Sequence, residues 1–171
     1  MLTALVLPVP EAAPVAEGWL ERTALSKPSH GMPTHVTVLI PFLPPAEVDG
    51  EVVGALRDLF AGVEPFGFTL PGCARFPTTL YLVPEPSAPF AALTEAVVGR
   101  WPACRPYGGQ FDELVPHLTV AQGEAGLLDA AEAEVAPRLP LASRATEVLL
   151  LEQTEPLLQG WDERARFPLG G

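Results

Sequence analysis

The chain has 171 residues, of which 48% are hydrophobic and 18% are charged, so it is long and apolar enough to fold around a sizeable core and is unlike a disordered segment. Acidic residues outnumber basic ones by 21 to 10, which gives a formal net charge of -11. Because binding along a nucleic-acid backbone requires many Lys and Arg contacts, this charge argues against long nucleic acid as a partner. It still allows a pocket for one or two phosphates, since a few local groups suffice.

Short apolar runs alternate with helical periods in the first half of the chain. The N-terminal run is broken by Pro8 and Pro10 and lacks a basic region, so we expect a strand there and not a signal peptide. After Pro45, apolar residues recur at steps of three or four, which predicts an amphipathic helix. The expected elements are strands over 2–8 and 35–42, helices over 14–26 and after Pro45, and a hairpin of strands over 66–71 and 78–83.

The second half repeats this order of elements. Ser87 is a suitable cap for a helix whose apolar residues fall on one face. Strands are expected over 116–121, 145–153 and 160–167, with a helix over 124–136. The pattern predicts an α+β fold with antiparallel sheets: one domain, 1–171, made of two similar lobes of about 1–85 and 86–171, with strand exchange between the lobes left open.

A histidine motif occurs once in each half. His35-Val-Thr37-Val and His117-Leu-Thr119-Val both open an apolar strand shortly after a proline. One His-x-Thr on a strand is typical of an ordinary solvent-facing pair. Two copies in matching positions favour a functional site. The third histidine, His30, lies in a predicted loop and is expected to be solvated.

Strand geometry predicts where these side chains point. Alternation along a strand places His35, Thr37 and Leu39 on one face, and Val36, Val38 and Ile40 on the opposite, helix-covered face. The same alternation puts His117 and Thr119 together on one face. If the two sheets face each other, two imidazoles and two hydroxyls line one cleft.

These four side chains suit hydrolysis of a cyclic phosphodiester. The reaction needs a base for the attacking water and an acid for the departing sugar oxygen, and histidine, with a pKa of about 6.5, can serve as either. Threonine hydroxyls can donate to the non-bridging oxygens and stabilise charge in the transition state. The scheme needs no metal and no cofactor, and Cys73 and Cys104 do not have metal-ligand spacing.

The two motifs, with the segment PTHVTVLIPFLPP, resemble the two-histidine (2H) phosphoesterase superfamily, and most closely its bacterial 2′-5′ RNA ligase-like branch, over nearly the whole chain. The resemblance implies a bilobal fold of two antiparallel sheets with outer helices, related by a pseudo-twofold, with His35, Thr37, His117 and Thr119 in a central cleft. It also implies metal-independent opening of 2′,3′-cyclic phosphates or cleavage of 2′-5′ linkages, with ligation in some members. By analogy, His117 is the base and His35 the acid.

Other residues are weaker candidates for substrate contacts. Tyr81 shares a strand face with Thr79 and can stack on a base, although a core or rim position is also typical of such a tyrosine. Five arginines are candidate phosphate clamps, and the sequence does not choose among them: Arg22, Arg75, Arg105, Arg144 and Arg166.

The leading hypothesis is a phosphodiesterase acting on a small nucleotide or an RNA-end cyclic phosphate, consistent with a role in RNA processing. One alternative is a non-catalytic nucleotide- or RNA-binding module on the same fold, and another is an interaction protein with a closed cleft. Two titratable histidines favour catalysis, because binding alone has no need of them. We expect a monomer in the cytoplasm, with no membrane contact.

Overall fold

The computed structural model describes residues 1–23, 31–110, 113–155 and 160–171, so His30 lies outside the described residues. The described residues form four α-helices: α1 (Ala13–Thr23), α2 (Gly50–Ala61), α3 (Ala88–Arg100) and α4 (Ala125–Val135). Their strands are β1 (Thr3–Pro8), β2 (His35–Leu39), β3 (Phe66–Leu70), β4 (Cys73–Phe76), β5 (Thr79–Leu82), β6 (Leu118–Gln122), β7 (Leu141–Ala145), β8 (Glu147–Glu155) and β9 (Gly160–Pro168).

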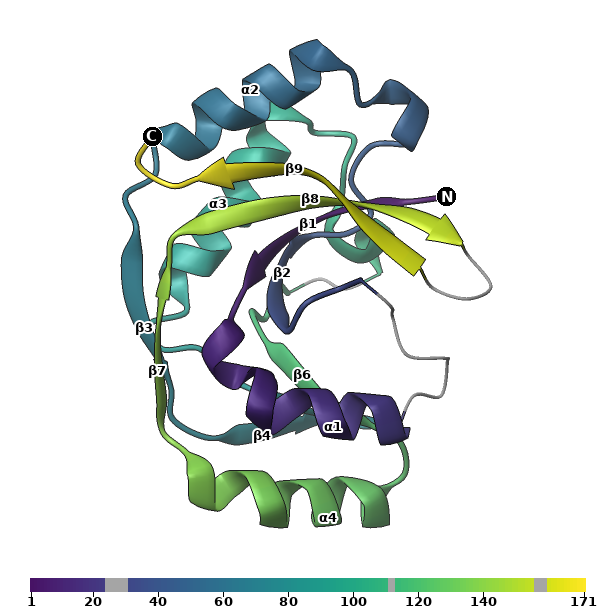
Figure 1. Cartoon of the computed structure of the whole chain (residues 1–171), viewed down its shortest axis with the longest axis vertical. Coiled ribbons are helices and arrows are strands. Elements are labelled where there is room, and N and C mark those ends of the chain that lie inside the picture. Colours follow the sequence, from purple (N-terminus) through teal and green to yellow (C-terminus); the bar gives the residue numbers. More distant parts are fainter. Residues whose placement is uncertain (24–30, 111–112, 156–159) are drawn as a thin grey trace.

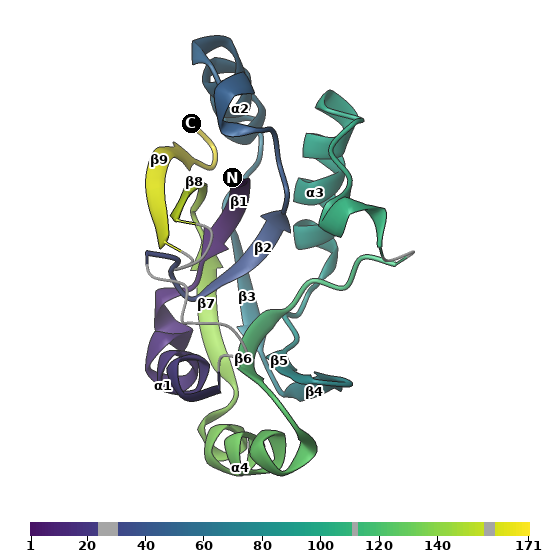
Figure 2. The same ribbon diagram turned by 90° about the vertical axis from the view of Figure 1, so that its right-hand side faces the viewer.

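The strands form three antiparallel sheets (Figure 1). A four-stranded sheet has the order β2-β1-β8-β9, a three-stranded sheet has the order β4-β5-β6, and β3 pairs with β7. Helices α2 and α3 contact the four-stranded sheet, whereas α1 and α4 contact the three-stranded one (Figure 2). Both larger sheets take strands from both halves of the chain. The α+β class with antiparallel sheets, expected from the sequence, is therefore confirmed.

The predicted hairpin of 66–71 with 78–83 is wrong. The connection between these segments is itself a strand, β4, which pairs with β5 from Phe76↔Thr79 to Cys73↔Leu82. Strand β3 pairs instead with β7, a strand that the sequence did not predict. Ala, Ser and Arg make up most of β7 and have little intrinsic preference for strands. Its conformation comes from the tertiary pairing with β3.

Helices α2 and α3 are stabilised at their N-termini in different ways. Asp49 caps α2 by accepting hydrogen bonds from the backbone N–H groups of Glu51 and Val52 at 3.0 and 2.9 Å, and Leu56 and Phe60 on its apolar stripe are buried. Ser87 occupies the N-cap position of α3 but makes no capping hydrogen bond. Packing of the buried α3 face against β2 therefore stabilises that helix.

Thr94 on α3 holds the helix against the strand that carries the first motif. Its side chain is buried, and its hydroxyl donates a hydrogen bond to the carbonyl of Val38 at 2.6 Å. The predicted alternation fails just beyond this point. Leu39 packs in the main core with Val36 and Val38, and Ile40 packs against a smaller cluster that includes Val6. A shift in the β1–β2 register explains this reversal.

Candidate functional site

The two motif histidines are anchored in the same way. Nδ1 of His35 lies 2.7 Å from the carbonyl oxygen of Pro33, and Nδ1 of His117 lies 2.7 Å from the carbonyl oxygen of Val115. A carbonyl only accepts hydrogen bonds, so Nδ1 carries the proton in both rings. In the neutral form, Nε2 of each ring is then the free base.

The strands carrying the motifs have matching irregularities. In β2 the pairing with β1 skips Val38, the residue after Thr37. In β6 the pairing with β5 skips Val120, the residue after Thr119. An extra residue of this kind bends a strand and redirects the neighbouring side chains. The two halves of the chain therefore share the histidine motif and also a β-bulge directly after its threonine.

His35 is held mainly in its neutral form. Its Nε2 lies 3.1 Å from Oγ1 of Thr37. Desolvation lowers the pKa of His35, the charge of His117 lowers it further, and the Pro33 carbonyl partly opposes both effects. Strands β2 and β6 contact one another, so the two imidazoles are close enough to influence each other electrostatically.

Three aromatic rings surround His117. Phe76 approaches the imidazole edge to face with centroids 5.3 Å apart, and Tyr81 does so at 5.5 Å. Tyr107 lies nearly parallel to it, at 6.4 Å and 24°. These contacts restrict how the imidazole can turn.

Tyr107 also reaches the first motif. Burial raises the pKa of its phenol, and a hydrogen bond with Thr37 partly offsets that rise. The phenol therefore keeps its proton at neutral pH. The sequence alone places Tyr107 only in a glycine-containing loop, because no strand or helix periodicity marks its segment.

Comparison with known proteins agrees with this geometry. The family model described as the 2′-5′ RNA ligase superfamily matches residues 8–156. The chain belongs to this superfamily of 2H phosphoesterases. The family resemblance predicted from the two histidine motifs is thus confirmed. Comparison with curated protein sequences gives no significant match.

Several solved structures share the fold of this chain. TT0787 of Thermus thermophilus has a TM-score of 0.67 and 20% identity, covering 100% of this chain and 99% of that one. LigT of E. coli, complexed with NADP+, has a TM-score of 0.59 and 21% identity, covering 99% and 98%. LigT complexed with 3′-AMP has a TM-score of 0.60 and 17% identity, also covering 99% and 98%.

Thr119 and Tyr81, the other predicted substrate contacts, differ in how exposed they are to solvent. Thr119 is partly exposed on β6 and pairs with Tyr81 on β5. Tyr81 is only 7% exposed and stacks on Phe76 with centroids 4.2 Å apart. One face of the Tyr81 ring is therefore already covered, and the tyrosine supports His117 directly.

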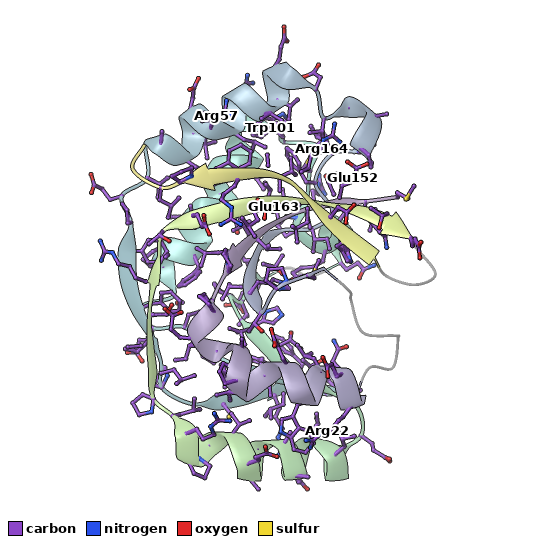
Figure 3. All side chains as sticks on the ribbon, viewed as in Figure 1. Arg22, Arg57, Trp101, Glu152, Glu163 and Arg164 are labelled. Carbon is purple, nitrogen blue, oxygen red and sulfur yellow. The ribbon has the colours of Figure 1, made fainter. Side chains whose placement is uncertain are left out.

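Three of the five candidate arginines already have partners. Such pairing reduces their availability for a substrate phosphate. Arg75 pairs with Asp129 and Glu132, Arg166 pairs with Glu147 and Glu163, and the Arg22 guanidinium lies 4.9 Å from the Trp19 ring. Arg164 is also paired, with Glu152 at 2.8 Å (Figure 3). Arg105 and Arg144 are exposed, and Arg105 lies two residues before Tyr107.

A groove of about 420 Å³ begins beside the first motif, at Pro33 and Thr34, and continues along α1, β8 and β9. Its charged lining residues are Glu17, Glu147, Glu163 and Arg166, so acidic groups predominate. This charge is unfavourable for a phosphate.

Among the residues that the structure describes, no group of three or more His, Cys, Asp and Glu side chains could hold a metal ion. No helix in the described part of the chain is long and apolar enough to cross a membrane.

Proposed function

We propose that the protein is a phosphodiesterase that hydrolyses a small 2′,3′-cyclic phosphate, or a 2′-5′ linked nucleotide or RNA end, by general acid/base catalysis with His35 and His117. The observation that carries the proposal is the matched anchoring of the two imidazoles through Nδ1, each followed by a strand hydroxyl and a bulge. Membership of a phosphoesterase superfamily supports it.

In the proposed reaction, water attacks phosphorus while one imidazole removes its proton. A bond forms between the water oxygen and phosphorus, and the bond from phosphorus to one ribose oxygen breaks. The other imidazole, in its protonated form, gives its proton to that ribose oxygen. The product is a phosphate monoester on the ribose, and the two histidines exchange protonation states.

The electrostatics favour His35 as the base, which reverses the assignment made by analogy. A base must begin neutral, and desolvation holds His35 in that form. The acid must begin protonated, and a positive charge on His117 further lowers the pKa of His35. Protonation of both imidazoles at once is therefore disfavoured.

Thr37 and Thr119 would bind the non-bridging phosphate oxygens. Without substrate, the Thr37 hydroxyl can donate to Nε2 of His35, which is 3.1 Å away. A bound phosphate offers a charged acceptor that makes a stronger hydrogen bond. When Thr37 turns to that oxygen, Nε2 is released to accept the proton of water.

The charge distribution favours a small substrate. The net charge of -11 and the paired arginines leave few cations for an extended phosphate backbone. Structures of LigT with 3′-AMP and with ATP have been solved, and nucleotides are therefore the first compounds to test.

A panel of 2′,3′-cyclic mononucleotides, cyclic-phosphate-ended oligonucleotides and 2′-5′ dinucleotides tests the proposal. We expect turnover of at least one class, with a single product regioisomer. Binding of these compounds without turnover under any condition would instead indicate the alternative function, a nucleotide-binding module that retains the fold.

A further inference from the structure

Tyr107 contacts both histidine motifs. Its phenol forms a hydrogen bond with Thr37, and its ring lies nearly parallel to the imidazole of His117. Because Thr37 is also within 3.1 Å of Nε2 of His35, the three side chains Tyr107, Thr37 and His35 form a continuous polar chain.

The backbone at Tyr107 is unusual. Its φ and ψ angles are 51° and 33°, in the left-handed region, and Gly108 and Gly109 follow with φ angles of 65° and 80°. A bulky residue rarely adopts this conformation, because its Cβ crowds the backbone. Such strain persists only where surrounding contacts enforce it, and it is concentrated at functional sites.

One of those contacts fixes the loop to the first motif. The backbone N–H of Tyr107 donates to the carbonyl of Ile40 at 2.7 Å, directly beyond the end of β2. The loop is therefore tied to the strand that carries His35 and Thr37, while the ring extends to the histidine beside β6. Tyr107 spans the two motifs from a single anchored position.

We infer that Tyr107 is a positioning residue, which holds the Thr37 hydroxyl toward His35 and fixes the orientation of His117. The hydrogen bond between the phenol and Thr37 fixes the position of the Thr37 hydroxyl beside Nε2 of His35. This inference rests on the proposed function, which supplies the reaction that the positioning serves.

The test compares Y107F, which loses only the phenol oxygen, with Y107G, which loses the ring and also relieves the left-handed backbone. We expect Y107F to lower kcat about tenfold with little change in KM, as for loss of one hydrogen bond. Y107G should lower kcat further, because it also removes the ring that lies beside the imidazole of His117. A Y107F variant with unchanged kcat would indicate a merely structural role and overturn the inference.

Double-mutant cycles then show whether Tyr107 affects kcat through Thr37. If Tyr107 acts through Thr37, Y107F causes no additional loss in a T37A background, whereas it adds its full effect in the matched T119A background. Equal effects of Y107F in both backgrounds would overturn the inference.

A second readout does not depend on turnover. The ¹⁵N chemical shift of His35 Nε2 reports the hydrogen bond from Thr37, and Y107F should move it in the same direction as T37A does. An unmoved signal would overturn the inference even if the enzyme is active. Lack of wild-type turnover on the substrate panel, together with a moved signal, would count against the proposed function alone.

Discussion

Nε2 of His35 lies 3.1 Å from Oγ1 of Thr37, on a ring whose Nδ1 is already committed to a backbone carbonyl. The motif residues thus bond to each other within one strand. This arrangement fixes the tautomer of His35 and holds the Thr37 hydroxyl beside Nε2 of His35.

The His35 imidazole should titrate below about 6.5 by NMR, because desolvation and the charge of His117 both disfavour its protonation. H117A removes that charge and should raise the pKa of His35. A wild-type His35 pKa above its ordinary value would contradict the assignment of His35 as the base.

The same shift has a consequence for stability. Because the pKa of His35 is lower in the folded than in the unfolded state, the unfolded state binds more protons between those two values. The free energy of unfolding should therefore fall as the pH drops below about 6.5, until the folded-state pKa is passed. Chemical denaturation at several pH values should show a smaller fall for H35Q than for the wild type.

The contact between α3 and β2 predicts a stability effect outside the chemistry. The Val38 carbonyl lies at the bulge and accepts a hydrogen bond from the buried hydroxyl of Thr94. T94V leaves that carbonyl without this donor and should lower the free energy of unfolding by about 1–3 kcal/mol. T94S, which keeps the hydroxyl, should lose clearly less in the same urea titration. Equal losses in the two variants would show that the methyl group contributes as much to the free energy of unfolding as the hydroxyl does.

Chelation provides a test of the chemistry. The proposed steps use imidazoles and hydroxyls only, so turnover should survive EDTA and follow a bell-shaped dependence of kcat/KM on pH. The measurement is kcat/KM across pH, with and without EDTA. If EDTA abolishes turnover and added metal restores it, a metal takes part and the two-histidine scheme is wrong.

Charge predicts a preference for short substrates. Mononucleotides or dinucleotides should be turned over with a higher kcat/KM than structured RNA at matched salt, because few unpaired cations are available to neutralise a long backbone. Competition between the two substrate classes at several salt concentrations measures this. A steep salt dependence with a preference for structured RNA would indicate an arginine cluster that binds the phosphate backbone.

The sequence predicted the helices and most strands because their apolar periods coincide with the buried faces, as at Leu56 and Phe60 of α2. The prediction from sequence failed where pairing between strands distant in the sequence determines the local conformation. Strand β7 depends on β3 for its conformation, and the β1–β2 register shift, which no periodicity reveals, turns Leu39 into the core.

The sequence singles out the histidines and threonines as candidates because the motif occurs twice, on strands that apolar alternation makes visible. Tyr107 was missed for the opposite reason. Its segment has no periodicity, and its role depends on a left-handed loop that brings it to Thr37 and His117. Two glycines after a tyrosine were the available signal, and they indicate a turn but not its destination.

We propose that His35 and His117 carry out the chemistry together, and the rates of H35A and H117A on a 2′,3′-cyclic mononucleotide test this most directly. Each variant should lose about a hundredfold to ten-thousandfold in kcat, and circular dichroism and Tm should confirm that both remain folded. The double variant should be little worse than either single one, since the two groups act in one step. Folded single variants that retain near wild-type kcat would contradict the account.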